Sequence, residues 1–267
     1  GMVGVEIRPA SAAGPTMTVT ATQGTNPYNG MLLRVKVLTG AAVMAAQTGG
    51  SGATSTALNT TFNTTEAGSY VYGAFSADDS EGTPAAESGT TFIDDFHETA
   101  HGEYYGSFRT TAATTTPGSV TVGSPGGNAY PGCAAQEILP AVSGTAPTED
   151  GSAPAVVTTT DTTVTSASFT PPAGSLIVVM VGAAGEGTLT VTDTGGGLTW
   201  TQLANTSDTD DDAGGYAGVW VADVPSADGG GVTVSGAVNL KKIVLSGSSA
   251  EESDITSAIK LKKIKLS

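Results

Sequence analysis

The feature that most constrains the fold of this chain is an internal repeat. Residues 102–122 align without gaps to residues 214–234. The matched positions are Gly102, Tyr104, Gly106 and Phe108 in the first copy and Gly214, Tyr216, Gly218 and Trp220 in the second. Upstream, NPYNGMLLRVKV at 26–37 corresponds to TPPAGSLIVVMV at 170–181. Self-similarity on this scale indicates a duplicated structural unit, with the first copy enlarged between positions 41 and 90.

Each copy has the period of a β-strand. In the second copy Tyr216, Gly218 and Trp220 alternate with Ala217, Val219 and Val221, which assigns the two sets to opposite faces. Short apolar runs are separated by Pro, Gly, Asp and Ser at intervals of about 8 to 12 residues, the spacing of sandwich strands. The 42 threonines and 37 glycines disfavour helix, and threonine favours strand. The fold class is therefore predicted to be all-β.

Two tandem β-sandwich domains follow from the repeat. The first is expected at residues 1–141 and the second at 156–236, with a linker of Pro, Gly, Ser and Ala composition at 142–155. Gly106 and Gly218 lie inside strands and predict a bulge or a close approach of another part of the chain, with aromatic neighbours filling the space.

The segment 237–267 carries a second, shorter repeat. VNLKKIVLS at 238–246 recurs as IKLKKIKLS at 259–267. A strand with a bulge at the lysine pair places all four apolar residues of each copy on one face. Two strands without a sheet of their own need a partner, so this tail is predicted to mediate assembly. Its contact residues are Val238, Leu240, Lys241, Lys242, Ile243, Leu245, Ile259, Leu261, Lys262, Lys263, Ile264 and Leu266.

Charge is distributed unevenly along the chain, whose net charge is −15. Residues 1–236 hold 22 of the 25 acidic side chains but only four of the ten basic ones. An acidic body repels phosphates and anionic lipid, so neither a nucleic-acid partner nor membrane insertion is expected. No run approaches the roughly 18 apolar residues of a membrane span, and no secretory leader is visible. Cys133 is the single cysteine, which excludes an intramolecular disulfide and a cysteine zinc cluster.

The HETAH segment is a candidate zinc site. His97, Glu98 and His101 match the H-E-x-x-H pattern, in which two imidazoles one helical turn apart bind Zn²⁺ and the glutamate activates water. The motif lies between two strand patterns, and the chain has no third histidine. A solvated loop is therefore favoured, with a zinc metallopeptidase as the alternative.

An acidic loop in the second copy is a candidate calcium site. Asp208, Asp210 and Asp212 alternate in a way that can bring oxygen ligands together. The spacing does not fit an EF-hand, because Gly214 is one place late, so a hydrated acidic loop is the alternative. No other cofactor is expected.

Aromatic side chains give one more candidate surface. Tyr104, Tyr105, Trp200, Tyr216 and Trp220 can form a platform that stacks on sugars, although aromatics at matched repeat positions are more often core.

Three segments, FTPPAGSLIVVMV, TVTDTGGGLTWT and GGYAGVWVADVP, resemble β-sandwich modules in virion structural proteins of phages that infect actinobacteria. The tail is similar to short repeats that end some of their minor tail or particle-surface proteins. The resemblance covers residues 150–267 and reaches 1–141 only through the internal repeat. It implies a non-enzymatic virion component of the minor tail or capsid-decoration type, made in the host cytoplasm, with other virion proteins and further copies of itself as partners. The alternatives are an adhesin that binds host-surface glycans and the zinc metallopeptidase.

Overall fold

The computed structural model describes residues 13–24, 30–42, 50–53, 57–78, 83–99, 102–127, 132–184, 188–207 and 215–225. These residues form strands, turns and bends and contain no helix, which confirms the all-β class. Every strand pair is antiparallel.

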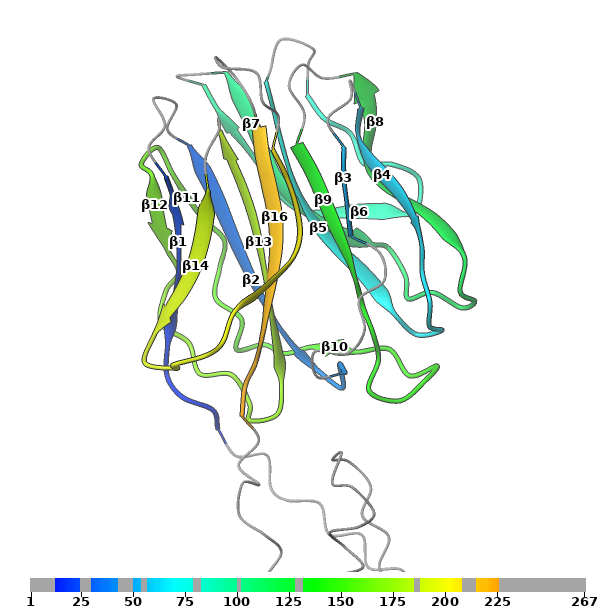
Figure 1. Cartoon of the computed structure of the whole chain (residues 1–267), viewed down its shortest axis with the longest axis vertical. Helices are drawn as coiled ribbons and strands as arrows, with labels where there is room; N and C mark the ends of the chain where they lie inside the picture. The colour runs from blue at the N-terminus through cyan, green and yellow to red at the C-terminus, as the bar shows by residue number, and fades with distance from the viewer. Residues whose placement is uncertain are drawn as a thin grey trace, which may run out of the picture. The chain divides into compact units, whose positions relative to one another are not determined.

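The strands form four sheets, which we number I to IV (Figure 1). Sheet I has the order β12-β1-β14, from Thr163–Thr165, Thr18–Gln23 and Leu189–Thr194. Sheet II has the order β10-β2-β13-β16-β15, from Thr148–Glu149, Met31–Thr39, Leu176–Ala184, Gly215–Asp223 and Thr201–Ser207, and β11 (Val157–Thr159) also pairs with β2. Sheet III has the order β3-β9-β5-β7-β6, from Gly50–Ala53, Gly132–Ile138, Tyr70–Asp78, Glu103–Thr110 and Thr90–Glu98. Sheet IV pairs β4 (Ala57–Asn63) with β8 (Ser119–Gly127).

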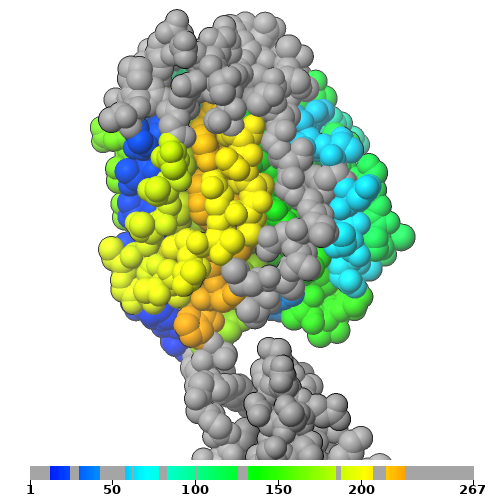
Figure 2. Space-filling view, in the orientation of Figure 1, coloured from blue at the N-terminus to red at the C-terminus, as the bar shows by residue number. Residues whose placement is uncertain are grey.

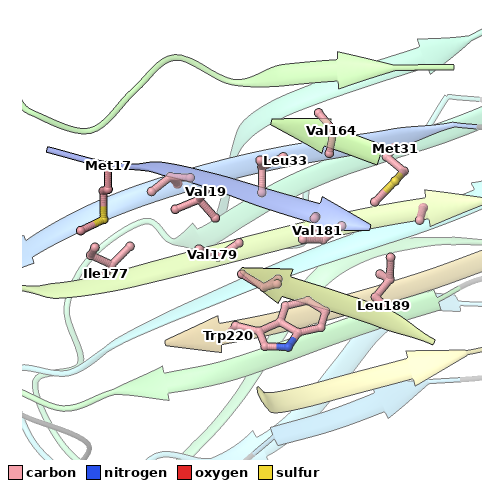
Figure 3. Close-up of a cluster of buried hydrophobic side chains, with 14 of the residues drawn as sticks. Met17, Val19, Met31, Leu33, Val164, Ile177, Val179, Val181, Leu189 and Trp220 are labelled. Atoms are coloured by element: carbon pink, nitrogen blue, oxygen red, sulfur yellow. The ribbon is translucent and has the colours of Figure 1, made fainter. Parts of the chain in front are cut away.

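The sheets are stacked in the order I, II, III, IV. Sheets I and II enclose one core, part of which is drawn in Figure 3, where Val19 and Leu189 face Val179 and Trp220. Sheet II packs its other face on sheet III, and sheet III packs its other face on sheet IV. All nine residues of β13 and all seven of β9 are buried. A strand covered on both faces favours apolar or small side chains, which explains why β13 is a continuous apolar run.

Two sandwiches are present, but they are not in tandem. Sheets I and II are built from residues 13–42 and 148–225, whereas sheets III and IV are built from 50–138. The second sandwich is inserted between β2 and β10 of the first. The expected domains at 1–141 and 156–236 and the linker at 142–155 are corrected accordingly, since β10 lies inside that linker and pairs with β2.

The cause of this correction is the relation between β2 and β13. Their sequences are similar, and we expected them to be equivalent strands of separate domains. They are instead antiparallel neighbours, with Val35 opposite Val179. Two similar apolar strands can lie in the same sheet when that sheet is covered on both faces. Sequence similarity alone does not show whether two such strands are neighbours in one sheet or equivalent strands of two domains.

The 102–122 and 214–234 repeat survives in two hairpins. In the β6–β7 hairpin the register shifts directly after Phe92, which is opposite Phe108. In the β15–β16 hairpin it shifts directly after Gln202, which is opposite Trp220. Because Phe108 and Trp220 are matched repeat positions, the two hairpins carry the same bulge. They occupy the same place in sheets III and II, in the orders β5-β7-β6 and β13-β16-β15.

Glycines allow close approach where the sequence predicted it. A Cβ at Gly106 would lie 2.2 Å from the Phe75 ring, and one at Gly218 would lie 2.5 Å from the Trp220 ring. Between sheets II and III, a Cβ at Gly182 would lie 2.5 Å from the Phe75 carbonyl oxygen. The backbones of the two inner sheets therefore touch at this point, and the two sandwiches form one packed body.

Candidate functional site

The HETAH segment does not begin as a helix. His97 and Glu98 are the last two residues of β6. His97 is exposed and stacks on Tyr104, with ring centroids 4.2 Å apart and planes 12° apart, whereas Glu98 is buried. Neighbouring strand residues point to opposite faces, so the arrangement that a helical zinc motif requires is not formed here. His101 lies outside the described residues.

The other predicted metal ligands and the tail also lie outside the part of the chain that the structure describes. They are Asp208, Asp210, Asp212 and the assembly residues Val238, Leu240, Lys241, Lys242, Ile243, Leu245, Ile259, Leu261, Lys262, Lys263, Ile264 and Leu266. Within the described ranges, no group of three or more His, Cys, Asp or Glu side chains is close enough to hold a metal ion. The calcium loop and the assembly tail remain predictions.

The hairpins that carry the two predicted metal loops end on the same side of the stack. Tyr105, near the start of β7, packs against Leu32 and Ala184. Ala184 is in turn opposite Gly215, the first residue of β16. The ends of β6–β7 and of β15–β16 are therefore neighbours, which the sequence did not predict.

A buried polar group lies at this end, and the sequence did not single it out. Glu98 is opposite Glu103 in the β6–β7 register, and the two are 5% and 2% exposed. Tyr105 follows on the same face and is fully buried. Burial, then the charges of Glu103 and Glu98, raise the pKa of Tyr105 far above its ordinary value, so its phenol stays protonated. The signal available in the sequence was the strand alternation of Glu103 with Tyr105.

The predicted sugar platform is not a surface. Tyr104, Tyr105, Tyr216 and Trp220 are all 9% exposed or less and belong to hydrophobic clusters. Trp200 packs against the first core and donates its Nε1 hydrogen to Asp193 Oδ1 at 3.0 Å. The four buried rings stabilise the sandwiches and offer no stacking face to a sugar, whereas Trp200 is half-buried.

Cys133 is enclosed within the same layers. Its side chain has no exposed surface, and burial raises the pKa of the thiol to about 12. Since the thiolate is the nucleophile, this cysteine acts as a small apolar residue.

An ion pair joins the two sandwiches. Arg34 on β2 of sheet II donates from Nε to Asp94 Oδ2 at 2.5 Å and from Nη2 to Oδ1 at 2.7 Å. Asp94 lies on β6 of sheet III, where Ser107 Oγ also donates to Oδ2 at 2.9 Å. The side chains of Arg34 and Asp94 are only 16% and 12% exposed. A two-point contact between planar groups fixes direction as well as distance, so this pair sets how sheet II lies on sheet III.

A second charged cluster centres on Glu149 of β10. Lys36 Nζ lies 2.6 Å from Oε2, and Oε1 accepts from Tyr72 Oη at 3.1 Å and lies 3.4 Å from Arg109 Nε. The Arg109 guanidinium also lies 5.1 Å from the centre of the Tyr70 ring. Lys36 belongs to sheet II, whereas Tyr72 and Arg109 belong to sheet III. Glu149 therefore links the two inner sheets.

This cluster predicts a pH dependence of stability. Burial acts to raise the pKa of Glu149, but the hydrogen bond and charge of Lys36, helped by Tyr72 and Arg109, lower it overall from 4.5. A carboxyl whose folded pKa is lowered stabilises the fold above its unfolded pKa and loses that contribution as pH falls through the folded value. Because Glu149 is about a third exposed, we expect Glu149→Gln to cost about 0.5 to 1 kcal/mol at pH 7.

Urea unfolding at pH 7 and at pH 3 measures this effect. The difference between the natural protein and Glu149→Gln should be smaller at pH 3 than at pH 7, because the stability that a lowered folded pKa confers is lost as the pH falls. An undiminished difference at pH 3 would mean that Glu149 acts through packing and not through its charge.

Glu137 is a fully buried carboxylate with a structural role. It is 1% exposed and accepts hydrogen bonds from Thr65 N, Thr65 Oγ1, Glu66 N and Ser69 Oγ. Such a fully bonded carboxylate holds the 64–69 turn against β9, since leaving it without donors would be costly.

The described part of the chain has no helix of the length and apolarity that a membrane span requires. Comparison of the sequence with family models and curated proteins, and of the fold with solved structures, gave no match.

Proposed function

We propose that the chain is a non-enzymatic structural protein of a bacteriophage virion, of the minor tail or capsid-surface type. It presents the stacked sandwiches as a rigid body and joins neighbouring virion proteins through its C-terminal segment. The assignment to a phage particle rests on the resemblance of its sandwich segments to modules of virion proteins.

The observation that carries the structural role is the use of charged side chains at the contacts between layers. Arg34, Asp94 and Glu149 connect sheet II to sheet III, and Glu137 holds a turn against β9. These side chains are satisfied by partners in the same fold. A catalytic acid or base, by contrast, must keep an atom within reach of a substrate. Charged side chains that bind one sheet to another support a role as a mechanically stable structural protein.

The tail supplies the proposed means of assembly. Segment 237–267 has six of the ten basic residues, whereas the body is strongly acidic. Addition of its two predicted strands to a sheet edge of a neighbour would supply main-chain hydrogen bonds, with alternate apolar residues giving specificity. Its lysines would favour approach to an acidic surface such as the body of another copy.

Deletion of residues 237–267 is expected to abolish incorporation into particles while the sandwiches still fold. Immunoblotting of purified particles measures incorporation, and circular dichroism of the truncated protein measures folding. Normal incorporation of the folded, truncated chain would refute the assembly role.

Two full-length variants test whether incorporation depends on the apolar residues of the tail or only on the length of the tail. Changing Leu240, Ile243, Leu261 and Ile264 to serine should reduce incorporation as deletion does. Shuffling the link between the two short repeats, residues 247–258, should leave incorporation unchanged, because the link carries no predicted contact.

A further inference from the structure

The outer edge of β6 is a docking surface with the chemistry that the C-terminal tail requires. β6 is the last strand of sheet III, and among the described residues it pairs with β7 alone. An edge strand presents a row of main-chain N–H and C=O groups that can pair with a further strand. The two predicted strands of the tail, which lie outside the described residues, need such an edge.

Apolar side chains on both faces of β6 are incompletely covered. Phe92, Ile93 and Phe96 are all half-buried. Phe92 packs against the core between sheets III and IV, and Ile93 and Phe96 pack against cores between sheets II and III. β7, which has a strand on each side, has seven of its eight residues buried. A further strand beside β6 would cover its three apolar side chains, and burial of that surface would favour the pairing.

The middle of the same edge carries two adjacent carboxylates. Asp94 is bonded to Arg34 and Ser107 within the body, whereas Asp95 is exposed. Charge on an edge strand hinders its pairing with strands in general, and like charges opposite each other destabilise a sheet. A partner strand with positive charge at the same place would replace this repulsion with attraction.

The tail has the complementary pattern. Residues 93–96 of β6 read Ile-Asp-Asp-Phe, and the two short repeats of the tail read Leu-Lys-Lys-Ile at 240–243 and at 261–264. In each segment a pair of like charges lies between two apolar residues. Charged positions therefore meet charged positions, and apolar positions meet apolar ones, whichever way the added strand runs.

The other edge strands lack this pattern. Among the described strands at sheet edges, β6 alone has two adjacent acidic residues. β15, yellow at the surface in Figure 2, has no acidic residue. β14, yellow-green in the same view, has Asp193, which is bonded to residues 196–200, and β10 has Glu149, which is bonded to Lys36. The charge pattern therefore selects β6 among the edges.

We propose that the β6 edge receives a Leu-Lys-Lys-Ile strand from the tail of a neighbouring copy, an inference that rests on the proposed assembly role of the tail. The described part of the chain has one such edge, whereas the tail has two such strands. One chain cannot satisfy both strands with this edge alone. A tail-to-edge contact joins two different surfaces, so it links successive copies into a ring or a row.

A charge exchange in the full-length protein tests this pairing. Sedimentation velocity over a concentration series measures self-association. We expect the natural protein to self-associate and Asp95→Lys to weaken the association roughly tenfold, because lysine then meets lysine. Glutamate in place of the four paired tail lysines should weaken it as well; these are Lys241, Lys242, Lys262 and Lys263. The two changes combined should restore association to within about threefold of the natural protein, which a misfolded variant would not do.

Asp161→Lys is the matched control. Asp161 is exposed between β11 and β12, so this variant changes the net charge by the same amount away from the β6 edge. We expect its association to stay within about twofold of that of the natural protein. Equal weakening by Asp95→Lys and Asp161→Lys would show that overall charge controls association, and it would overturn the proposal.

Two other results would also overturn the proposal. A natural protein that stays monomeric at every concentration does not use this edge between copies. Association that Asp95→Lys leaves unchanged places the contact on another surface. Either result leaves the assembly role standing if deletion of residues 237–267 still abolishes incorporation into particles, so failure of the edge contact and failure of the proposed function are distinguishable.

Discussion

Replacement of Gly182 by valine is expected to lower the free energy of unfolding by about 3 kcal/mol or more, enough to prevent folding in a marginal protein. Gly182 lies on β13, where sheets II and III touch. Its new Cβ would meet the Phe75 carbonyl oxygen at 2.5 Å and the Tyr105 Cβ at 3.3 Å. Neither strand can withdraw easily, because β13 is bonded to β2 and β16 and β5 is bonded to β7 and β9.

Denaturant unfolding followed by tryptophan fluorescence measures this loss. Gly151→Ala is the matched control, since a Cβ at that exposed glycine meets nothing within 4 Å; we expect it to change stability by less than about 0.5 kcal/mol. If Gly182→Val were as stable as the control, the direct backbone contact between the two sandwiches would be wrong.

Replacement of Arg34 by methionine is expected to cost about 2 to 4 kcal/mol. The change leaves Asp94 largely buried with only Ser107 as donor. Removing one partner of a buried ion pair is costly chiefly because the remaining charge stays without its counter-charge. The value lies below that of a fully buried pair because both side chains keep some contact with water.

A double-mutant cycle separates this effect from lost packing. Arg34→Met combined with Asp94→Leu removes both charges and should restore stability to within about 1 kcal/mol of the natural protein. If the two single losses simply added, Arg34 and Asp94 would not be coupled, and the ion pair would not set the packing of sheet II on sheet III.

Local pattern was enough to predict the strand class and the duplicated hairpin. The alternation around Tyr216, Gly218 and Trp220 reflects the two faces of β16, and its match to Tyr104, Gly106 and Phe108 identified a real equivalence in sheet III. Gly106 and Gly218 were expected at close approaches and are found there. These features depend on neighbouring residues, which a sequence displays directly.

The nesting of the two sandwiches depends on pairing between distant residues. Val35 lies opposite Val179 although more than a hundred residues separate them, and no local pattern specifies that partner. The same holds for Arg34 and Asp94. Nothing in the sequence indicated that these two side chains form an ion pair between sheets II and III. The HETAH spacing implies a metal site only when the segment is helical, and its first two residues, His97 and Glu98, instead end β6.

The most direct test of the structural role is the protein content of the particle itself. Quantitative mass spectrometry of purified virions, from the genome that encodes this chain, should find it as an intact component in a fixed number of copies per particle. The amount should stay constant through high-salt washing, since burial of apolar strands is not screened as surface charge is. Absence of the chain from purified virions, or its removal by the wash, would contradict the account.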